Sequence, residues 1–359
     1  WASSLAFLAL STTSAKAAFA SVQDKPFPND IFTAPEFRWA VIGCGVIANQ
    51  MAQSLALAGR KLTGVANRTL TKAQTFADQY GVEKVYDTVE DLYADPDIDA
   101  VYITTPHNTH ITYLRAALAA GKHVLCEKAI TLNSAELDEA RAIAAEHNVV
   151  LMDATTVLHM PLYQELRRRM DAGEFGRMNL AQLNFGSYKE YGDLTNRFYN
   201  RNLAGGAMLD IGVYALSVMR LFMASQPVEV VSLGNTCETG VDVAGGIVCR
   251  NAEQQLGVVS LTLHSKQPKR SVISFDNCYV EVNEYPRADH ATIVWTADGH
   301  REEVAAGTEA YALCYEMADL EQAVAGDDSK RELLDYASDV MELMTKLRAD
   351  WGVVYPEEE

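Results

Sequence analysis

From residue 38 onward, short apolar runs alternate with segments whose apolar residues recur at helical spacing. The helical pattern is clear in VIANQMAQSLALAG and in NSAELDEARAIAAEHN. The apolar runs are nearly continuous, which is typical of parallel strands buried on both faces: RWAVIGCG, LTGVAN, DAVYITT, HVLCEK and VVLMDAT. This alternation predicts an α/β domain with a doubly wound parallel sheet, which we place at residues 37–157.

The pattern changes in the second half of the chain. Strand-like runs follow one another through connections that are too short for crossover helices, which predicts antiparallel pairing. These runs are VEVVSLGNTCE, GGIVCR, QLGVVSLTLH, RSVISFDNCYVEVN and ATIVWTAD. We therefore predict a second α/β domain, residues 158–359, with an open, mostly antiparallel sheet. We expect its last helix to pack back on the first domain.

The first 36 residues follow neither pattern. LAFLALSTTSAKAAFA has a short apolar core and then small residues, as a secretory signal does, but no basic residue precedes the core. We expect a poorly ordered leader or extension on a cytoplasmic protein, with export as the alternative if the segment is a truncated signal. No later run reaches the ~20 apolar residues of a membrane span, so we expect none.

The charge balance narrows the expected partners. The chain has 30 basic and 48 acidic residues among 359, for a net charge of -18. Nucleic acids and anionic membranes need clustered Lys and Arg, so we expect neither as a partner. The six cysteines show no metal-ligand spacing, so we expect no metal site. A small molecule remains the expected partner.

The segment GCGVIA matches the GxGxxG/A pattern between the first strand and the first helix. Gly43 permits the tight turn, and Gly45 lets the backbone approach a pyrophosphate. We place the pyrophosphate at the N-terminus of the helix, on Val46 and Ile47. The alternative is a turn whose small residues serve packing alone. The context favours a Rossmann domain that binds a dinucleotide.

The end of the second strand bears on the choice of dinucleotide. About twenty residues after the glycine loop, an NAD site commonly offers Asp or Glu to the ribose 2′-hydroxyl. This chain has Asn67 and Arg68 there. No carboxylate would repel a 2′-phosphate, and Arg68 can form a charge-assisted pair with it. We therefore predict NADP(H), with NAD(H) as the alternative. Arg68 would otherwise be an ordinary exposed arginine.

Ligands of an open parallel sheet lie beyond the carboxyl ends of its strands. The fourth strand is followed there by Thr105, Pro106 and His107, and the fifth strand ends in Glu127 and Lys128. We expect these residues beside the cofactor. Partial desolvation weakens the preference of a lysine for its charged form, so we expect a lowered pKa of Lys128 that suits proton transfer. A lone lysine would more simply be salt-bridged at the strand end.

A second group of candidates lies in AGGAMLDIGVYAL. Asp210 and Tyr214 are four residues apart, and so lie on one face of a helix. A carboxylate and a phenol on one face can polarise a hydroxyl and relay its proton. The alternative is that Asp210 caps the helix and Tyr214 packs in the core, and spacing alone does not separate the two.

Four motifs in this order and spacing resemble the Gfo/Idh/MocA oxidoreductase family: AVIGCGVIA, YITTPHNTH, HVLCEKAI and GGAMLDIGVY. They are most similar to its branch of dimeric dihydrodiol dehydrogenases and NADP-dependent xylose dehydrogenases. The resemblance implies that Lys128 is the catalytic acid or base, or its helper, and that Tyr214 donates the proton beside Asp210. It places His110 near the cofactor, with a buried, hydrogen-bonded histidine as the alternative. It also implies a homodimer formed through the free face of the second sheet.

The chain departs from the pattern of this branch. Ala129 replaces the proline that usually follows the lysine and shapes the turn, often as a cis bond. An aromatic diol pocket is less expected, because three of its positions differ: Asp153, Thr156 and Leu158. In the loop before GGAMLDIGVY, four residues are candidate substrate contacts: Arg197, Tyr199, Arg201 and Asn202. The alternative is that they belong to a polar surface loop.

We therefore predict an NADP(H)-dependent oxidoreductase that moves a hydride between nicotinamide and a carbon bearing a hydroxyl or carbonyl group. The substrate would be a sugar, a polyol or a diol, with Lys128 and Tyr214 handling the proton and Asp210 orienting the substrate. One alternative is a non-catalytic dinucleotide sensor on the same fold. Another is an exported enzyme with tightly bound NADP, similar to glucose-fructose oxidoreductase.

Overall fold

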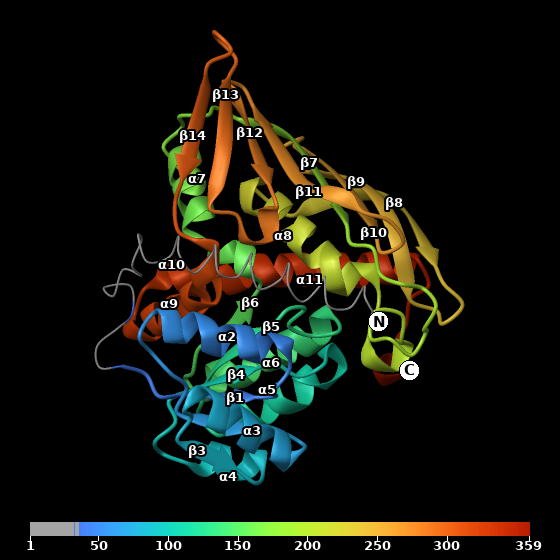
Figure 1. The fold of residues 1–359 in the computed structure, drawn as a ribbon. Helices are drawn as coiled ribbons and strands as arrows, with labels where there is room; N and C mark the ends of the chain where they lie inside the picture. Colours follow the sequence, from blue (N-terminus) through green and yellow to red (C-terminus); the bar gives the residue numbers. More distant parts are fainter. Residues whose placement is uncertain (1–31, 33–35) are drawn as a thin grey trace, which may run out of the picture.

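A computed structural model describes residue 32 and residues 36–359. The expectation of a poorly ordered leader falls almost entirely outside the described residues. Figure 1 shows a parallel sheet with its helices in the first part of the chain, a large second sheet, and helices between the two sheets. The predicted fold class is confirmed, whereas the domain boundary at residues 157 and 158 stays a prediction.

The first sheet has six parallel strands in the order β3-β2-β1-β4-β5-β6. Its strands are β1 (Trp39–Ile42), β2 (Gly64–Ala66), β3 (Lys84–Tyr86), β4 (Ala100–Ile103), β5 (His123–Glu127) and β6 (Leu151–Ala154). The helices between them are α2 (Val46–Leu57), α3 (Leu70–Tyr80), α4 (Val89–Ala94), α5 (His110–Ala119) and α6 (Ser134–Glu146). Every residue of β1, β2, β4 and β6 is buried, which explains their continuous apolar runs.

The second sheet has eight strands in the order β14-β13-β12-β11-β7-β10-β9-β8. They are β7 (Met178–Gly186), β8 (Pro227–Thr236), β9 (Asp242–Asn251), β10 (Leu256–Thr262), β11 (Gln267–Phe275), β12 (Cys278–Asn283), β13 (His290–Trp295) and β14 (Arg301–Ala305). Only β7 and β10 pair in parallel. Two details differ from the prediction. The run RSVISFDNCYVEVN is a hairpin of two strands that turns at Asp276 and Asn277, and β14 was not predicted.

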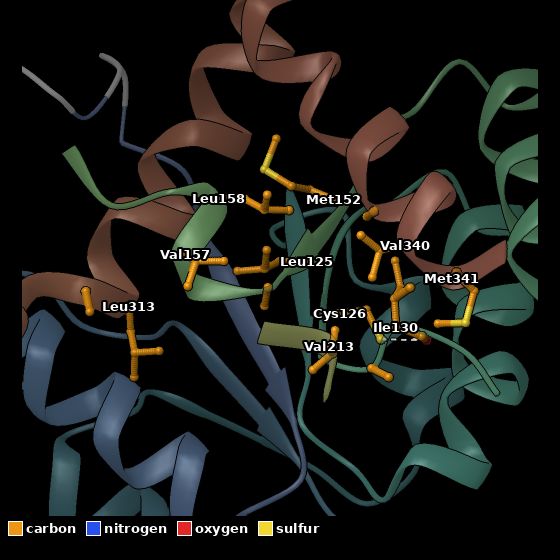
Figure 2. Packing of buried hydrophobic residues seen from close by; sticks show 14 of the residues in the cluster. Leu125, Cys126, Ile130, Met152, Val157, Leu158, Val213, Leu313, Val340 and Met341 are labelled. Atoms are coloured by element: carbon orange, nitrogen blue, oxygen red, sulfur yellow. Dashed lines mark hydrogen bonds between the residues drawn. The ribbon is translucent and has the colours of Figure 1, made fainter. Parts of the chain in front are cut away.

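The helices of the second half cover the inner face of this sheet and reach the first domain. They are α7 (Pro161–Asp171), a π-helical segment (Met208–Gly212), α8 (Val213–Phe222), α9 (Ala312–Ala325), α10 (Asp328–Arg331) and α11 (Leu333–Asp350). Helix α8 packs on β7, and α11 contacts α8 on one side and α6 and β6 on the other. Figure 2 shows Val340 and Met341 of α11 in the same buried cluster as Leu125 and Met152 of the parallel sheet.

Polar contacts reinforce the junction between the two domains. The guanidinium of Arg348, on α11, donates to the carbonyl oxygen of Leu132 at 2.6 Å and pairs with Glu358 at 2.8 Å. The indole Nε1 of Trp39, at the start of β1, donates to Glu321 of α9 at 2.9 Å. These contacts pair buried donors with acceptors across the junction, which favours one arrangement of the two domains.

The helical stretch Arg201–Phe222 is long and apolar enough, by composition, to cross a membrane. However, 83% of its most apolar window is buried inside the protein, beneath the second sheet. Burial of this kind is expected for the core helix of a globular domain, which is apolar all round.

The outer face of the second sheet has an apolar region at its β8 end. Val231 and Leu233 are 75% and 83% exposed on β8, and Val248 is 47% exposed on β9. Val231 is paired directly with Val248, which is paired with Val258 on β10, so these side chains share one face. A contiguous exposed patch of this kind usually marks a contact surface.

Candidate active site

The glycine loop has the geometry of a phosphate cradle. Gly43 has a φ of 105°, which an L side chain rarely adopts, and its N–H donates to Ala66 O on the next strand. A Cβ at Gly43 would lie 2.7 Å from the Thr104 hydroxyl oxygen, whereas a Cβ at Gly45 would meet no atom within 4 Å. The space at Gly45 opens onto the N-terminus of α2, whose first N–H groups have no intrahelical acceptor. Val46 and Ile47 begin this helix, so the residues present fit a dinucleotide pyrophosphate.

The turn after β2 carries a cation, Arg68. Asn67 is half-buried and donates through Nδ2 to Thr69 O at 3.0 Å, which holds the turn into α3. Arg68 is exposed, and within the described residues it forms no salt bridge. Lys72 lies one turn further along and close enough to lower the pKa of Cys44 in the glycine loop, although burial of that thiol outweighs it. Two cations therefore flank the expected ribose position.

The segment after β4 holds the loop after β5 in place. His110 is fully buried, with Nε2 2.8 Å from Thr105 O and Nδ1 3.0 Å from Ala129 O. His107 lies with Nε2 3.0 Å from Lys128 O, and burial, reinforced by the Lys128 charge, lowers its pKa to about 3. Pro106 precedes the short helix that carries His107. These contacts are those of the buried-histidine alternative for His110, and they fix the position of the lysine backbone.

Glu127 is turned into the protein. One carboxylate oxygen accepts a short hydrogen bond from the Tyr102 hydroxyl, and the other accepts from Lys128 N at 3.3 Å. Burial raises the pKa of Glu127, and both contacts oppose that rise. The Glu127 side chain therefore holds the end of β5 from inside the protein.

Lys128 projects from the end of β5 toward the second domain. Its Nζ donates to Asp210 O at 2.6 Å and to Asp210 Oδ1 at 3.3 Å, and it lies 4.9 Å from the centre of the Tyr214 ring. The peptide bond between Lys128 and Ala129 is cis, as with the proline of the family pattern. The expectation of a lowered pKa is wrong. Burial lowers the pKa of Lys128, but Tyr214, Asp210 and Glu127 together outweigh it and raise the pKa above its usual value.

Asp210 and Tyr214 lie in the same site, but they are not on one regular α-helix. Asp210 belongs to the π-helical segment, and Tyr214 lies in the first turn of α8. Single π-turns inside helices are frequent at functional sites. Asp210 pairs with Lys128 and Arg197 and does not cap a helix. Burial would raise its pKa, but Lys128, Arg197 and His107 lower it overall, so its carboxylate is charged.

Burial raises the pKa of the Tyr214 phenol, and the nearby Lys128 charge opposes this rise. The phenol is therefore a proton donor at neutral pH, and the lysine makes the loss of its proton easier. Lys128, Asp210 and Tyr214 line one pocket of about 570 Å³. The pocket lies at the carboxyl edge of the parallel sheet, where a ligand was expected.

The second domain supplies lining residues that were not predicted. Among them are Phe185, Lys189, Lys269 and Arg287, and Gln50 of α2 lines the pocket from the Rossmann side. Lys189 lies three residues beyond β7, and the rule for the carboxyl ends of parallel strands does not extend to this mostly antiparallel sheet, so no signal in the sequence indicates it. A second groove, of about 650 Å³, lies between α7 and β14, but its cations Arg168 and Arg169 are paired with Glu165 and Glu302, and it shares no lining residue with this pocket.

The remaining candidate residues differ in whether they line the pocket. Of the loop residues proposed as substrate contacts, only Arg197 lines the pocket. Tyr199 is buried, Arg201 pairs with Glu359, and Asn202 O accepts from Asn108. The three positions that depart from the dihydrodiol pattern are all buried: Asp153, Thr156 and Leu158.

Comparison with known proteins agrees with this architecture. Residues 37–155 match the family described as "Oxidoreductase family, NAD-binding Rossmann fold", and residues 163–281 match the "GFO/IDH/MocA C-terminal domain". The trans-1,2-dihydrobenzene-1,2-diol dehydrogenase of Mus musculus is 32% identical over 243 residues, which cover 66% of this chain and 72% of that protein. The Xenopus laevis protein of the same name is 27% identical over 332 residues, which cover 89% of this chain and 99% of that one.

Solved structures show the same fold over nearly the whole chain. Levoglucosan dehydrogenase, in complex with NADH and levoglucosan, has a TM-score of 0.76 at 19% identity and covers 88% of this chain and 97% of its own. KijD10, a 3-ketoreductase from Actinomadura kijaniata in complex with NADP and TDP-benzene, has a TM-score of 0.73 at 25% identity, with 87% and 97% covered. The chain belongs to the Gfo/Idh/MocA family of oxidoreductases, which confirms the resemblance of its motifs. It is an NAD(P)-dependent dehydrogenase or reductase.

The pKa directions predict opposite pH profiles for the two directions of the reaction. Oxidation of a hydroxyl needs a deprotonated acceptor, and both Lys128 and Tyr214 have raised pKa values, so their basic forms are scarce at neutral pH. We expect kcat/KM for oxidation to rise steadily between about pH 6 and 9, and that for reduction to stay level and fall only at higher pH. Initial rates in both directions test this. An oxidation profile that is level across this range would contradict the assignment.

Proposed function

We propose that this protein is an NADP(H)-dependent enzyme that interconverts a hydroxyl and a carbonyl group on a sugar, polyol or diol. The observation that carries the proposal is the convergence of Lys128, Asp210 and Tyr214 in one pocket that is also lined by Gln50, on the helix that the glycine loop opens. The names of the relatives support the substrate class, since they include dihydrodiol and levoglucosan dehydrogenases.

The cofactor would be held by Gly43, Gly45 and the start of α2, and when bound it supplies or accepts a hydride. In the reducing direction, Tyr214 donates its phenolic proton to the substrate oxygen. Lys128 donates a hydrogen bond to the same oxygen, and its charge makes proton loss from the phenol easier. Asp210 accepts from the lysine and so fixes the direction in which the ammonium group points. Phe185 adds an apolar wall to a pocket that is otherwise lined mainly by polar side chains.

Replacing Lys128 tests the catalytic assignment. We expect Lys128→Met to lower kcat by about 100-fold or more, because both the hydrogen bond and the charge beside Tyr214 are lost. Lys61→Met is the matched control, since Lys61 is an exposed lysine paired with Glu83 on the Rossmann domain. The assay is the change in nicotinamide absorbance across aldoses, polyols and diols, with NADPH affinity measured in parallel.

Two outcomes would count against this assignment. Turnover of Lys128→Met close to that of the wild type, with NADPH bound normally, would show that the lysine is not catalytic. A wild-type protein that binds NADPH but turns over no member of the panel would favour the dinucleotide sensor instead.

The preference for NADP(H) depends on Arg68. A guanidinium–phosphate pair is among the stronger hydrogen-bonded contacts, so we expect Arg68→Ala to lower kcat/KM for NADP+ by about tenfold or more. The rate with NAD+, which lacks the 2′-phosphate, is the internal control and should change little. Equal losses with both cofactors would show that Arg68 does not read the 2′-phosphate.

We also propose a homodimer formed through the outer face of the second sheet. The patch of Val231, Leu233 and Val248 would be covered by the partner's equivalent residues, since a two-fold axis brings the same surface together. We expect Leu233→Asp to convert the dimer to a monomer in light scattering after gel filtration. Leu203→Asp, at an exposed leucine outside the sheets, is the control. A monomeric wild type at all concentrations would refute the dimer.

A further inference from the structure

The pocket is rich in cations although the chain as a whole is strongly acidic. Five cationic side chains line it, in a protein with 30 basic and 48 acidic residues. They are Lys128, Lys189, Arg197, Lys269 and Arg287. Four carboxylates also line it, those of Asp210, Glu284, Asp289 and Glu309, so cations exceed anions by one. A local excess of cations in an acidic protein suggests an anionic ligand.

The partners of these cations show where the excess lies. Lys269 is paired with Glu284 at 2.9 Å. Lys128 and Arg197 share a single carboxylate, that of Asp210, at 3.3 Å and 3.5 Å. Within the described part of the chain, neither Lys189 nor Arg287 has a salt bridge, and Arg287 donates to Gln50 Oε1 at 3.1 Å.

Lys189 and Arg197 form one binding surface. The ammonium of Lys189 lies 4.0 Å from the centre of the Phe198 ring, and the Arg197 guanidinium lies 4.2 Å from the same centre. Burial lowers the pKa of Lys189, and although Asp210 opposes this, the charges of Arg197 and Lys128 add to it. The two like charges repel each other, and an anion near both would weaken that repulsion.

The backbone holds both side chains in place. Lys189 N donates to Leu263 O at 2.7 Å, which continues the pairing of β7 with β10. A Cβ at Gly205 would lie 2.6 Å from Arg197 O, so the loop packs tightly where it returns to the helix. The cations are therefore presented from a rigid support, as a specificity site requires.

We propose that Lys189 and Arg197 bind an anionic substituent of the substrate, a carboxylate or a phosphate, and so make the enzyme prefer an acidic sugar derivative to its neutral counterpart. The proposal rests on the proposed oxidoreductase function and names the substrate class of the same pocket. The glycine loop and α2 already provide for the cofactor pyrophosphate on the Rossmann side, which leaves these two cations of the second domain for the substrate.

The test compares D-glucose, D-glucuronate and D-glucose 6-phosphate with the NADP+-saturated protein. We expect kcat/KM to be about tenfold or more higher for at least one of the two anions than for D-glucose. The preference should shrink in about 0.5 M NaCl, because salt screens a partly exposed pair. A preference for glucuronate alone identifies a carboxylate, and a preference for the 6-phosphate alone identifies a phosphate. Ligand-induced shifts in Tm are measured on the same samples.

Variants separate a local contact from the general field of the protein. We expect Lys189→Gln and Arg197→Gln each to lower the ratio of anionic to neutral kcat/KM by about tenfold, mainly through KM, and Lys189→Arg to retain most of it. Lys266→Gln removes an exposed charge next to β11, outside the pocket lining, and should leave the ratio within about twofold.

The outcomes distinguish this inference from the proposed function. Turnover of neutral sugars without preference for either anion would overturn the inference and leave the function standing. Loss of all turnover, with a larger Tm shift for an anion that Lys189→Gln abolishes, would support the binding site and overturn the function. No greater response to either anion than to D-glucose, in rate and in Tm, overturns the inference.

Discussion

The buried ammonium group of Lys128 is the constraint on which the arrangement of the site depends. Removing an ammonium from water is costly unless oxygen atoms replace the lost water. The Rossmann domain places the lysine, but the side-chain and main-chain oxygens that accept its protons belong to Asp210 in the second domain. Both side chains are almost enclosed, at 13% and 11% exposed. In the docked protein, the oxygens of the second domain therefore replace the water that the lysine has lost.

The docking itself is provided by the end of the chain. Helices α9 and α11 return to the parallel sheet after the second sheet is complete, and they contact β5 and β6, the strands nearest the pocket. Arg348 of α11 binds the carbonyl of Leu132, four residues beyond Lys128. The position of the lysine thus depends on residues more than half the chain away. A change in these helices can alter catalysis without touching a catalytic group.

How well a feature could be predicted from the sequence depends on how local its signal is. The parallel sheet and its glycine loop depend on continuous apolar runs and on fixed spacing, and both were confirmed. Asp210 and Tyr214 were placed together from their spacing, although Asp210 lies in a π-helical segment and Tyr214 in the α-helix that follows it. The pKa of Lys128 was predicted in the wrong direction, because it depends on charges from the other domain. Lys189 was missed because only the folded sheet shows that its loop faces the pocket.

The two sides of the pocket differ in what they demand of the sequence. On the Rossmann side, backbone geometry does the binding, and a Cβ at Gly43 would collide with Thr104, so few residues are tolerated there. On the other side, side chains line the pocket from a loop whose backbone is tied to the second sheet by Lys189 N and closed on itself by the hydrogen bond from Gly206 N to Phe198 O. Side chains on a tied loop can change without moving their support. The side chains of this loop can therefore vary while the glycine loop stays unchanged.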